Sequence, residues 1–157
     1  MNRKTLNDYL SFNRDILIGV TCGSFTSAVT SQLIANYTNI FTNSLISLVA
    51  DMSIFLTVFG ILYYRHNKHM FTVEHEDKTK RIEFAKLKLV LIKLASTLSV
   101  AEIEYNTVKP YFHYLFLSKG YEPFLASMIA SSITIIGYVA VVDMMAYLTR
   151  LFKQHSK

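Results

Sequence analysis

The chain has 157 residues, of which 52% are hydrophobic and only 17% are charged. Soluble domains carry about 25% charged residues, so this composition favours a protein that lies in a membrane. A domain of ordinary size has roughly 150 residues, which predicts one domain over residues 1–157 and excludes a large multidomain enzyme. Because Cys22 is the single cysteine, an intramolecular disulfide is also excluded.

The first two predicted helices lie in residues 16–50, which contain no lysine, arginine, aspartate or glutamate. This stretch is too long for one membrane span, because about 20 residues cross the hydrocarbon core. The polar residues 36–39 divide it. We therefore expect helices over about 16–35 and 40–64, joined by a tight turn, with Asp51 as the only charged residue of the second helix.

Another helix is predicted at about 123–148, where Asp143 is the only charged residue. Residues 87–117 are long enough for a further span, but they contain two glutamates, three lysines and a proline. Residues 65–86 are expected to form a loop between the second and third helices. The predicted fold is an all-α, four-helix bundle that is integral to the membrane.

The basic residues predict an orientation in the membrane. All of the 16 lysines and arginines except Lys93, Lys109 and Lys119 lie near the chain ends or in and beside the loop at 65–86. Cytoplasmic segments are enriched in lysine and arginine, so both termini and this loop are expected in the cytoplasm. The protein would be a multi-pass cell-membrane protein with the lipid bilayer as a partner. Its positive charge would face anionic lipid headgroups, and no nucleic acid is needed to explain it.

A shift of 83 residues aligns the second predicted helix with the fourth. It places Phe41 on Phe124, and further along it places Tyr64 on Tyr147. Two helical hairpins of the same orientation would then be parallel repeats around an axis along the membrane normal, as in some transporters. The alternative is a chance match between two apolar helices.

Small residues recur every four positions in two of the predicted helices. These residues are Gly23, Ser27 and Ser31 in the first helix, and Ala126 and Ala130 in the fourth. Small residues at this spacing let helix backbones approach closely, which drives helix association in lipid. We expect both sets to be packing faces.

The most informative polar pattern lies in the third predicted helix. Four side chains at spacings of four, three and four residues share one face, and they are Glu102, Asn106, Lys109 and His113. A charge near the bilayer centre costs about 3 kcal/mol on insertion scales, so this polar face should point into the bundle or towards a partner. Pro110 frees a backbone carbonyl near Asn106, which adds hydrogen-bonding capacity to the same face.

Three interpretations of this polar face remain open. In a transport site, Glu102 would take up a proton or a cationic group, and Lys109 or His113 would bind an anionic group. In a structural element, the face would pair with Asp51 of the second helix or with a neighbouring subunit. In the third, outer-end interpretation, Lys109 and His113 lie near the outer end of the helix and their side chains extend to the external membrane surface. Asp51 lies too deep to do so and must be paired, protonated or functional.

Patterns for metal binding and catalysis are weak. His66, His69 and His75 lie in the predicted loop, but no cysteine or ordered helical ligand set completes a metal site with them. The sequence contains no glycine-rich phosphate loop, zinc-protease motif or serine-hydrolase motif. We therefore expect no metal, no cofactor and no enzymatic activity of the chain by itself.

The four-helix layout and residues 117–131 (LSKGYEPFLASMIAS) resemble the GtrA-like family of small membrane proteins. The resemblance covers about residues 15–152. It implies a role in moving polyprenyl-linked sugars across a membrane. The third helix of this chain is more polar than the family pattern.

Two functions from different classes are expected. The favoured one is a non-catalytic accessory or scaffold subunit of a larger membrane complex, because the packing faces are clear. It predicts that the polar face of the third helix points outward, towards a partner. The alternative is a small transporter or flippase of a lipid-linked or charged substrate, acting as a homo-oligomer. It predicts that Asp51 and Glu102 face a shared wet cavity.

Overall fold

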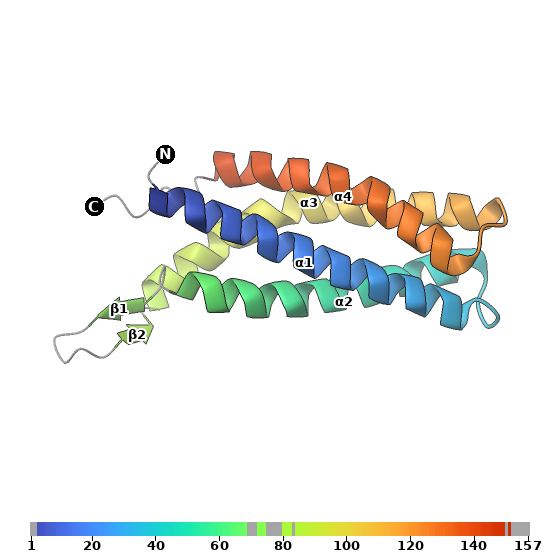
Figure 1. Cartoon of the computed structure of the whole chain (residues 1–157), viewed down its shortest axis with the longest axis horizontal. Coiled ribbons are helices and arrows are strands. Elements are labelled where there is room, and N and C mark those ends of the chain that lie inside the picture. The colour runs from blue at the N-terminus through green and yellow to red at the C-terminus, as the bar shows by residue number, and fades with distance from the viewer. Residues whose placement is uncertain (1–2, 69–71, 75–79, 83, 150, 152–157) are drawn as a thin grey trace.

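The computed structural model describes residues 3–68, 72–74, 80–82, 84–149 and 151, and it contains four helices and one short β-hairpin (Figure 1). In chain order the elements are α1 (Arg3–Ile34), α2 (Ile40–Asn67), β1 (Thr72–Glu74), β2 (Lys80–Ile82), α3 (Phe84–Ser118) and α4 (Pro123–Leu148). Consecutive helices run in opposite directions. The start of α1, the end of α4 and the β-hairpin therefore share one end of the molecule, called the hairpin end. The connections 35–39 and 119–122 share the other, called the short-loop end.

Local sequence signals fix the two short connections. The side chain of Asn39 caps α2 by accepting a hydrogen bond of 2.8 Å from the backbone N–H of Thr42. In the other connection Gly120 has a φ of 84°, in the left-handed region that favours glycine. Pro123 stands in the first turn of α4, where its missing N–H leaves no helical hydrogen bond unmade. These turns make each helix antiparallel to the one before it.

Contacts between helices follow the order α1, α2, α3, α4 and back to α1. They are most extensive within the α1–α2 and α3–α4 hairpins, and least extensive between α2 and α3. The predicted arrangement of four helices is confirmed. The bounds predicted for the fourth helix are those of α4, and the third helix is three residues longer at its start than predicted.

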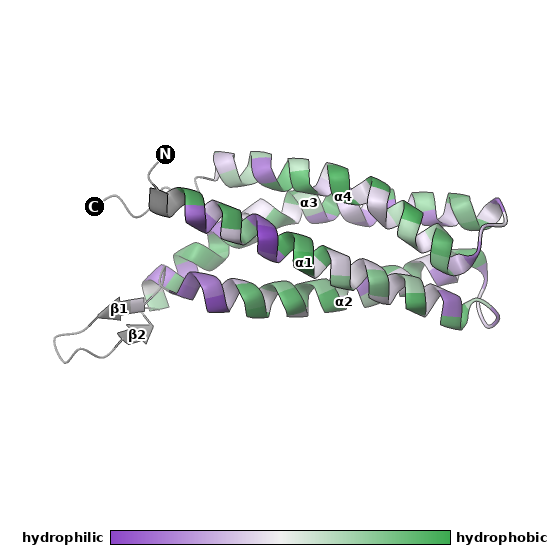
Figure 2. Ribbon diagram, viewed as in Figure 1, coloured by the Kyte–Doolittle hydropathy of each residue, from purple (hydrophilic) through white to green (hydrophobic). Residues whose placement is uncertain are grey.

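Three of the helices are long and apolar enough to cross a membrane, namely α1 over Leu6–Ile34, α2 and α4. The 28 residues of α2 rise about 42 Å, which exceeds the hydrocarbon core of about 30 Å. Hydrophobic residues cover most of α2 and α4, whereas hydrophilic residues gather towards the ends of the molecule (Figure 2). Within the described residues α3 does not meet the same measure, in line with its mixed composition.

Helix α1 begins much earlier than the predicted boundary at Ile16. The prediction followed the charge-free stretch, but residues 3–15 continue the helix because they form an amphipathic segment. Within it Phe12 is fully buried, whereas Leu10 is 55% exposed. The ring of Phe12 packs edge-on against Phe59 of α2 at a centroid distance of 5.9 Å. Tertiary packing therefore stabilises a helix start that charge alone does not predict.

The predicted loop at 65–86 is wrong in one respect, because it contains the antiparallel strands β1 and β2. Thr72 pairs with Ile82, and Glu74 pairs with Lys80. The flanking helices also extend into this segment from both sides. Three-residue strands are too short for a two-residue periodicity to be recognised. Among the described residues, the regular secondary structure is therefore helical except for this hairpin.

The bundle interior has two halves of different chemistry. Towards the hairpin end, aromatic rings contact one another: Phe12, Phe55, Phe59, Tyr63 and Tyr138. Towards the short-loop end, many buried side chains are polar, including Ser27, Ser31, Asn43, Lys109 and His113. The candidate site lies in this polar half and at its boundary with the aromatic half.

Buried positions follow the same spacing in the two halves of the chain. Every buried residue of α2 between Asn43 and Tyr63 has a buried counterpart 83 residues later in α4. Every buried residue of α3 between Thr97 and His113 has a buried counterpart 82 residues earlier in α1. The two hairpins thus bury matching faces.

Candidate functional site

An ion pair between Asp51 of α2 and Lys109 of α3 lies in the middle of the polar interior. The ammonium of Lys109 donates a hydrogen bond to Oδ2 of Asp51. Each of the two residues is only 1% exposed, so the pair is shielded from the surroundings of the bundle. The pair spans the seam between α2 and α3, which are the neighbouring helices with the least contact.

Two hydroxyl groups contact this ion pair, and a third is linked to it through Ser27. The Tyr105 hydroxyl donates a hydrogen bond of 2.6 Å to Oδ2 of Asp51. Lys109 Nζ donates a bond of 3.0 Å to Ser27 Oγ. The hydroxyl of Ser27 in turn shares a hydrogen bond of 3.1 Å with that of Ser127. Because Ser27 belongs to α1 and Ser127 to α4, the ion pair is connected to all four helices.

Gly23 of α1 makes room for Asp51. A Cβ at position 23 would clash with Oδ1 of Asp51 and would lie 2.8 Å from its backbone oxygen. The backbone oxygen cannot move away as a flexible side chain could, so this close approach requires glycine. Gly23 therefore positions the carboxylate as well as packing two helices together.

A second polar cluster lies one helical turn nearer the short-loop end. His113 Nε2 is 3.1 Å from Ser31 Oγ, and this hydroxyl donates a bond of 2.7 Å to Oδ1 of Asn43. The Asn43 amide donates back to the backbone carbonyl of Ser31 at 2.9 Å. With His113 only 1% exposed, the cluster extends the polar interior from the ion pair towards the short-loop end.

Glu102 lies on the other side of the ion pair, where the aromatic half begins. Its Oε1 accepts a hydrogen bond of 3.0 Å from the Tyr138 hydroxyl. Asp51, Tyr105, Glu102 and Tyr138 line a cavity of about 10 Å³ together with apolar side chains. A cavity of this volume holds about one water molecule. Two carboxyl groups and two phenols therefore line a cavity that has room for about one water molecule.

Several buried polar atoms of the bundle have no hydrogen-bond partner within the described part of the chain. Among them are Ser24 Oγ, Asn106 Oδ1 and Ser131 Oγ. Ser24 and Ser131 lie close to the Tyr105 hydroxyl, which is itself bound to Asp51. Buried polar groups are normally hydrogen-bonded, so the two serine hydroxyls beside Tyr105 keep hydrogen-bonding capacity that the contacts described above do not use.

Glu104 lies off the polar face of α3 that Glu102, Lys109 and His113 share. Its carboxylate lies over Gly137 of α4, and Oε1 would be only 2.6 Å from a Cβ placed there. Its Oε2 is buried and has no hydrogen-bond partner among the residues that the structure describes. This carboxyl is therefore a separate polar feature on the α3–α4 side of the bundle.

A wider groove of about 320 Å³ lies between α2 and α3 near the short-loop end. It is lined by Phe41, Ser44, Leu45, Pro110, Tyr111 and Tyr114. Pro110 stands inside α3, where it removes one backbone hydrogen bond. The lining is mainly apolar and aromatic, which suits a hydrocarbon chain better than an ion.

The histidines proposed as weak metal ligands do not form a site in the described residues. His66 Nδ1 is 2.9 Å from Oδ2 of Asp15, and Arg14 lies 3.4 Å from Oδ1 of the same carboxylate. His69 and His75 lie outside the described residues. In the ranges that are described, no three histidine, cysteine, aspartate or glutamate side chains are grouped to hold a metal.

The four residues of the predicted polar face of α3 differ in how deeply they are buried in the bundle. Lys109 and His113 are fully buried, and Glu102 and Asn106 are partly buried. The outer-end interpretation is wrong for Lys109 and His113, because their side chains end inside the bundle. The pairing of this face with Asp51 is present.

All of the predicted packing residues are buried, namely Gly23, Ser27, Ser31, Ala126 and Ala130. The two serines also donate or accept the hydrogen bonds described above. The stripe of small residues in α1 therefore has a polar role that its spacing alone does not reveal.

Two site residues, Tyr105 and Tyr138, are not evident from the polar pattern. Tyr105 stands four residues before Lys109, so it shares a helix face with Lys109 and with His113. That spacing was a usable signal. Tyr138 could not be found in this way, because its link to Glu102 depends on how α4 packs against α3.

Comparisons with models of protein families, with curated proteins and with solved structures find no match. The resemblance to GtrA-like proteins therefore stays a sequence-based prediction. Any functional proposal has to rest on the geometry of the site.

Proposed function

We propose that the protein is a small membrane transport protein that moves a proton or another ion no larger than a water molecule. The ion pair of Asp51 and Lys109 is its central site. The observation that carries this proposal is the complete burial of two opposite charges at the point where all four helices are connected.

The energetics of burial support a functional role for this pair. Taking a charged side chain out of water costs several kcal/mol per ion even after relaxation, and a buried ion pair seldom repays this as net stability. Apolar or small residues would hold the helices together equally well. Ionisable residues inside membranes usually mark ion pathways or proton relays.

The size of the cavity restricts the substrate class. The space between Asp51 and Glu102 accommodates about one water molecule and is bordered by groups that can exchange protons or coordinate a cation. A lipid-linked sugar does not fit there. The only support for such a substrate is the apolar groove between α2 and α3, which has the volume for part of a hydrocarbon chain.

We further propose that the four helices cross the membrane. Exposed aromatic residues occur at both ends of the bundle, with Tyr37, Phe41 and Tyr111 at the short-loop end and Tyr64 and Tyr147 at the hairpin end. From Phe41 to Tyr64, α2 rises about 34 Å, close to the hydrocarbon thickness of about 30 Å. Aromatic belts of this kind form where the protein meets the membrane surface.

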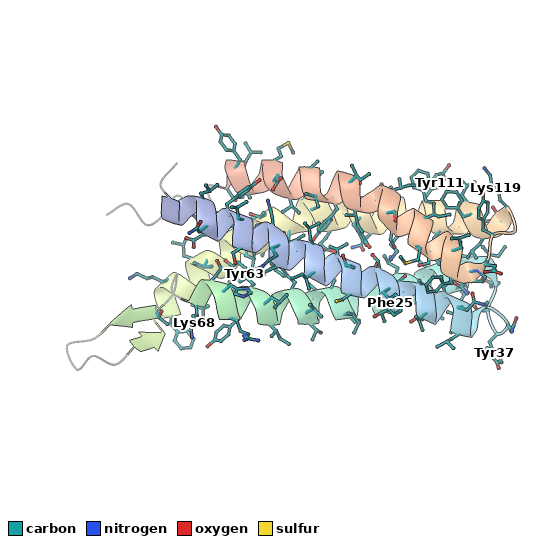
Figure 3. All side chains as sticks on the ribbon, in the orientation of Figure 1. Phe25, Tyr37, Tyr63, Lys68, Tyr111 and Lys119 are labelled. Carbon is teal, nitrogen blue, oxygen red and sulfur yellow. The ribbon has the colours of Figure 1, made fainter. Side chains whose placement is uncertain are left out.

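The charge distribution supports placing the hairpin end in the cytoplasm. Lys119 is the only lysine or arginine in the two short connections, and it lies at the short-loop end (Figure 3). Lys68 lies at the opposite end of the molecule (Figure 3). Apart from Lys93 and Lys109 within α3, the other lysines and arginines fall near the chain ends or in and beside residues 65–86 of the sequence. The positive-inside rule then gives cytoplasmic termini in the cell membrane.

A parallel internal repeat is part of the same proposal. The matching buried faces of α1 with α3 and of α2 with α4 support it. Ser27 contacts Lys109, its own counterpart after the shift of 82 residues, and Phe55 contacts Tyr138, its counterpart after 83. Residues that contact their own counterparts lie close to a two-fold axis. Such an axis would run along the bundle, through the proposed site.

The accessory-subunit function remains a second candidate, because Glu104 lies on the outer side of α3 without a partner in the described residues. A helix from another protein could supply a hydrogen bond to it. Lys109 and His113, however, point into the bundle, which is the opposite of what a partner-binding polar face requires.

Reconstitution of the purified protein into liposomes tests the transport proposal. A pH-sensitive dye inside the liposomes would report proton entry, and ion-selective dyes would report sodium or potassium entry under a potassium-diffusion potential. We expect one of these fluxes to exceed that of empty liposomes. The double substitution Asp51→Asn with Lys109→Met should abolish it.

The matched control is Ser53→Ala, two residues from Asp51 on the exposed side of α2. Among the described residues, its hydroxyl bonds only to the backbone of its own helix, at Val49. This variant should keep the flux of the unmodified protein. Proton, sodium and potassium fluxes equal to those of empty liposomes would refute the proposal, as would an unchanged flux in the folded double variant.

A further inference from the structure

Glu104 differs from the other carboxyl groups inside the bundle in what surrounds it. Asp51 is paired with Lys109, and Glu102 accepts a hydrogen bond from Tyr138. The Oε2 atom of Glu104 is buried and unpartnered within the described residues, and its side chain lies in a notch that only a glycine, Gly137, leaves open on α4.

This notch opens to the outer surface of the bundle near the middle of the membrane. The neighbouring side chains Ile103 of α3 and Ile136 of α4 are 69% and 76% exposed. Gly137 lies about halfway along α4, which runs over Pro123–Leu148. In the membrane placement proposed above, Glu104 therefore faces lipid far from either water layer.

A carboxylate in these surroundings would be a bare negative charge in hydrocarbon. An isolated ionised carboxyl in an apolar medium costs so much free energy that the group takes up a proton instead. Ionisable residues at such positions are rare and are functional sites by default. The free-energy cost of burying a protonated Glu104 is much smaller than that of burying its carboxylate, because the neutral carboxyl has only ordinary hydrogen-bonding groups to satisfy.

We propose that Glu104 is a proton-binding site, in which a neutral carboxyl sits in the Gly137 notch and faces the membrane lipid. It is separate from the central site at Asp51. The proposal rests on the membrane placement given under the proposed function, but it does not require ion transport through the bundle.

The charged and titratable groups around Glu104 leave it without a counter-ion. On α4 the described ionisable side chains are Tyr138, Asp143 and Tyr147. Tyr138 donates to Glu102, and Asp143 accepts a bond from Asn13 of α1.

On α3 itself, the nearest cation in the sequence is Lys109, whose ammonium is bound to Asp51 and Ser27 inside the bundle. Glu102, also on α3, accepts its hydrogen bond from Tyr138 and is not a cation. A proton is therefore the ligand that the described surroundings leave for Glu104.

Covalent labelling with a hydrophobic carbodiimide tests this inference directly. A protonated carboxyl adds its O–H across one C=N bond of dicyclohexylcarbodiimide to give an O-acylisourea, which rearranges to a stable N-acylurea. All atoms of both reactants remain in the product, so no other reagent is needed. We expect mass spectrometry of the full-length protein in its native membrane to show one adduct, located on the peptide that contains Glu104.

Three variants and a second reagent make the test specific. Glu104→Gln should lose the adduct, and Glu102→Gln should keep it. Gly137→Ala should speed up labelling, because the new methyl group displaces the Glu104 carboxyl towards the lipid. A water-soluble carbodiimide should not label the site, because water does not reach it.

Four results would overturn the proposal. They are the absence of an adduct on Glu104, an adduct on Glu102 instead, equal labelling by the water-soluble reagent, and labelling that occurs only after extraction into detergent. The last result would mean that a partner protein covers Glu104 in the membrane. A failure of ion flux with normal labelling, or the reverse, distinguishes this inference from the proposed function.

Discussion

At the scale of single residues, Asp51 and Lys109 show how a costly pair is accommodated. Oδ2 of Asp51 accepts bonds from Lys109 and from Tyr105, and Gly23 leaves space for the rest of the carboxylate. Ser27 accepts a second bond from the ammonium. Removing one partner leaves the other as an unpaired charge, which costs far more than removing both.

A double-mutant cycle measures this asymmetry. We expect Asp51→Asn or Lys109→Met alone to lower the free energy of unfolding by about 3–5 kcal/mol, because each leaves one uncompensated buried charge. The double variant should recover most of that loss. Unfolding in mixed micelles by a denaturing detergent gives the free energies. A double variant as unstable as the sum of the two single variants would contradict a simple ion pair.

Two glycine substitutions provide a matched comparison. Gly23→Ala should be strongly destabilising, because the new Cβ would meet the backbone oxygen of Asp51 at 2.8 Å as well as its side chain. Gly60→Ala in α2 should be neutral or stabilising by up to about 1 kcal/mol, because a Cβ there has no neighbour within 4 Å and alanine favours helix. Thermal unfolding in detergent is the measurement. Equal effects of the two changes would show that Gly23 does not hold Asp51 in place.

At the scale of elements, a charge-free window predicts the membrane part of a helix and not its whole length. The window gave the bounds of α4, but α1 continues for thirteen residues before Ile16, from Arg3. That extension is stabilised by the contact of Phe12 with Phe59 and Tyr63 of α2. Residues 3–15 contain the amphipathic pattern of a helix, but their many polar residues lower the mean hydropathy, so a search for apolar stretches does not find it.

Truncating Phe12 tests whether the start of α1 belongs to the core. Phe12→Ala should lower the free energy of unfolding by about 3–5 kcal/mol, the usual cost of removing a buried aromatic ring. Leu10→Ala, two residues earlier and 55% exposed, should change it by less than about 1 kcal/mol. Chemical unfolding monitored by circular dichroism compares the two variants. Similar small effects would mean that this segment does not pack on α2.

At the scale of the whole molecule, the fourth helix closes the bundle against the first. Ser27 of α1 and Ser127 of α4 share a hydrogen bond of 3.1 Å between residues that are 100 positions apart. This contact joins the predicted packing face of α1 to the residue next to Ala126 on α4. It also closes the ring of helices around the ion pair, so the environment of Asp51 depends on both hairpins.

Cysteine cross-linking tests this closure. In a Cys22→Ala background, Ser27→Cys combined with Ser127→Cys should form an intramolecular disulfide on mild oxidation in the membrane, because the two side-chain oxygens lie 3.1 Å apart. Ser27→Cys combined with Ser53→Cys should not, since Ser53 points away from the bundle. Migration on a denaturing gel before and after reduction reports the bond. Cross-linking between chains instead would indicate a different assembly of the hairpins.

The amino-acid sequence is enough to predict the four helices, the turn at residues 36–39 and the polar face of the third helix, because composition and spacing act locally along the chain. It also singled out Asp51 and Lys109 as charges that needed an explanation. Their pairing with each other, and the position of Glu104 over Gly137, became evident from the packed helices alone. Partners on different helices depend on the rotation and height of each helix, and these are set by packing between segments far apart in the chain.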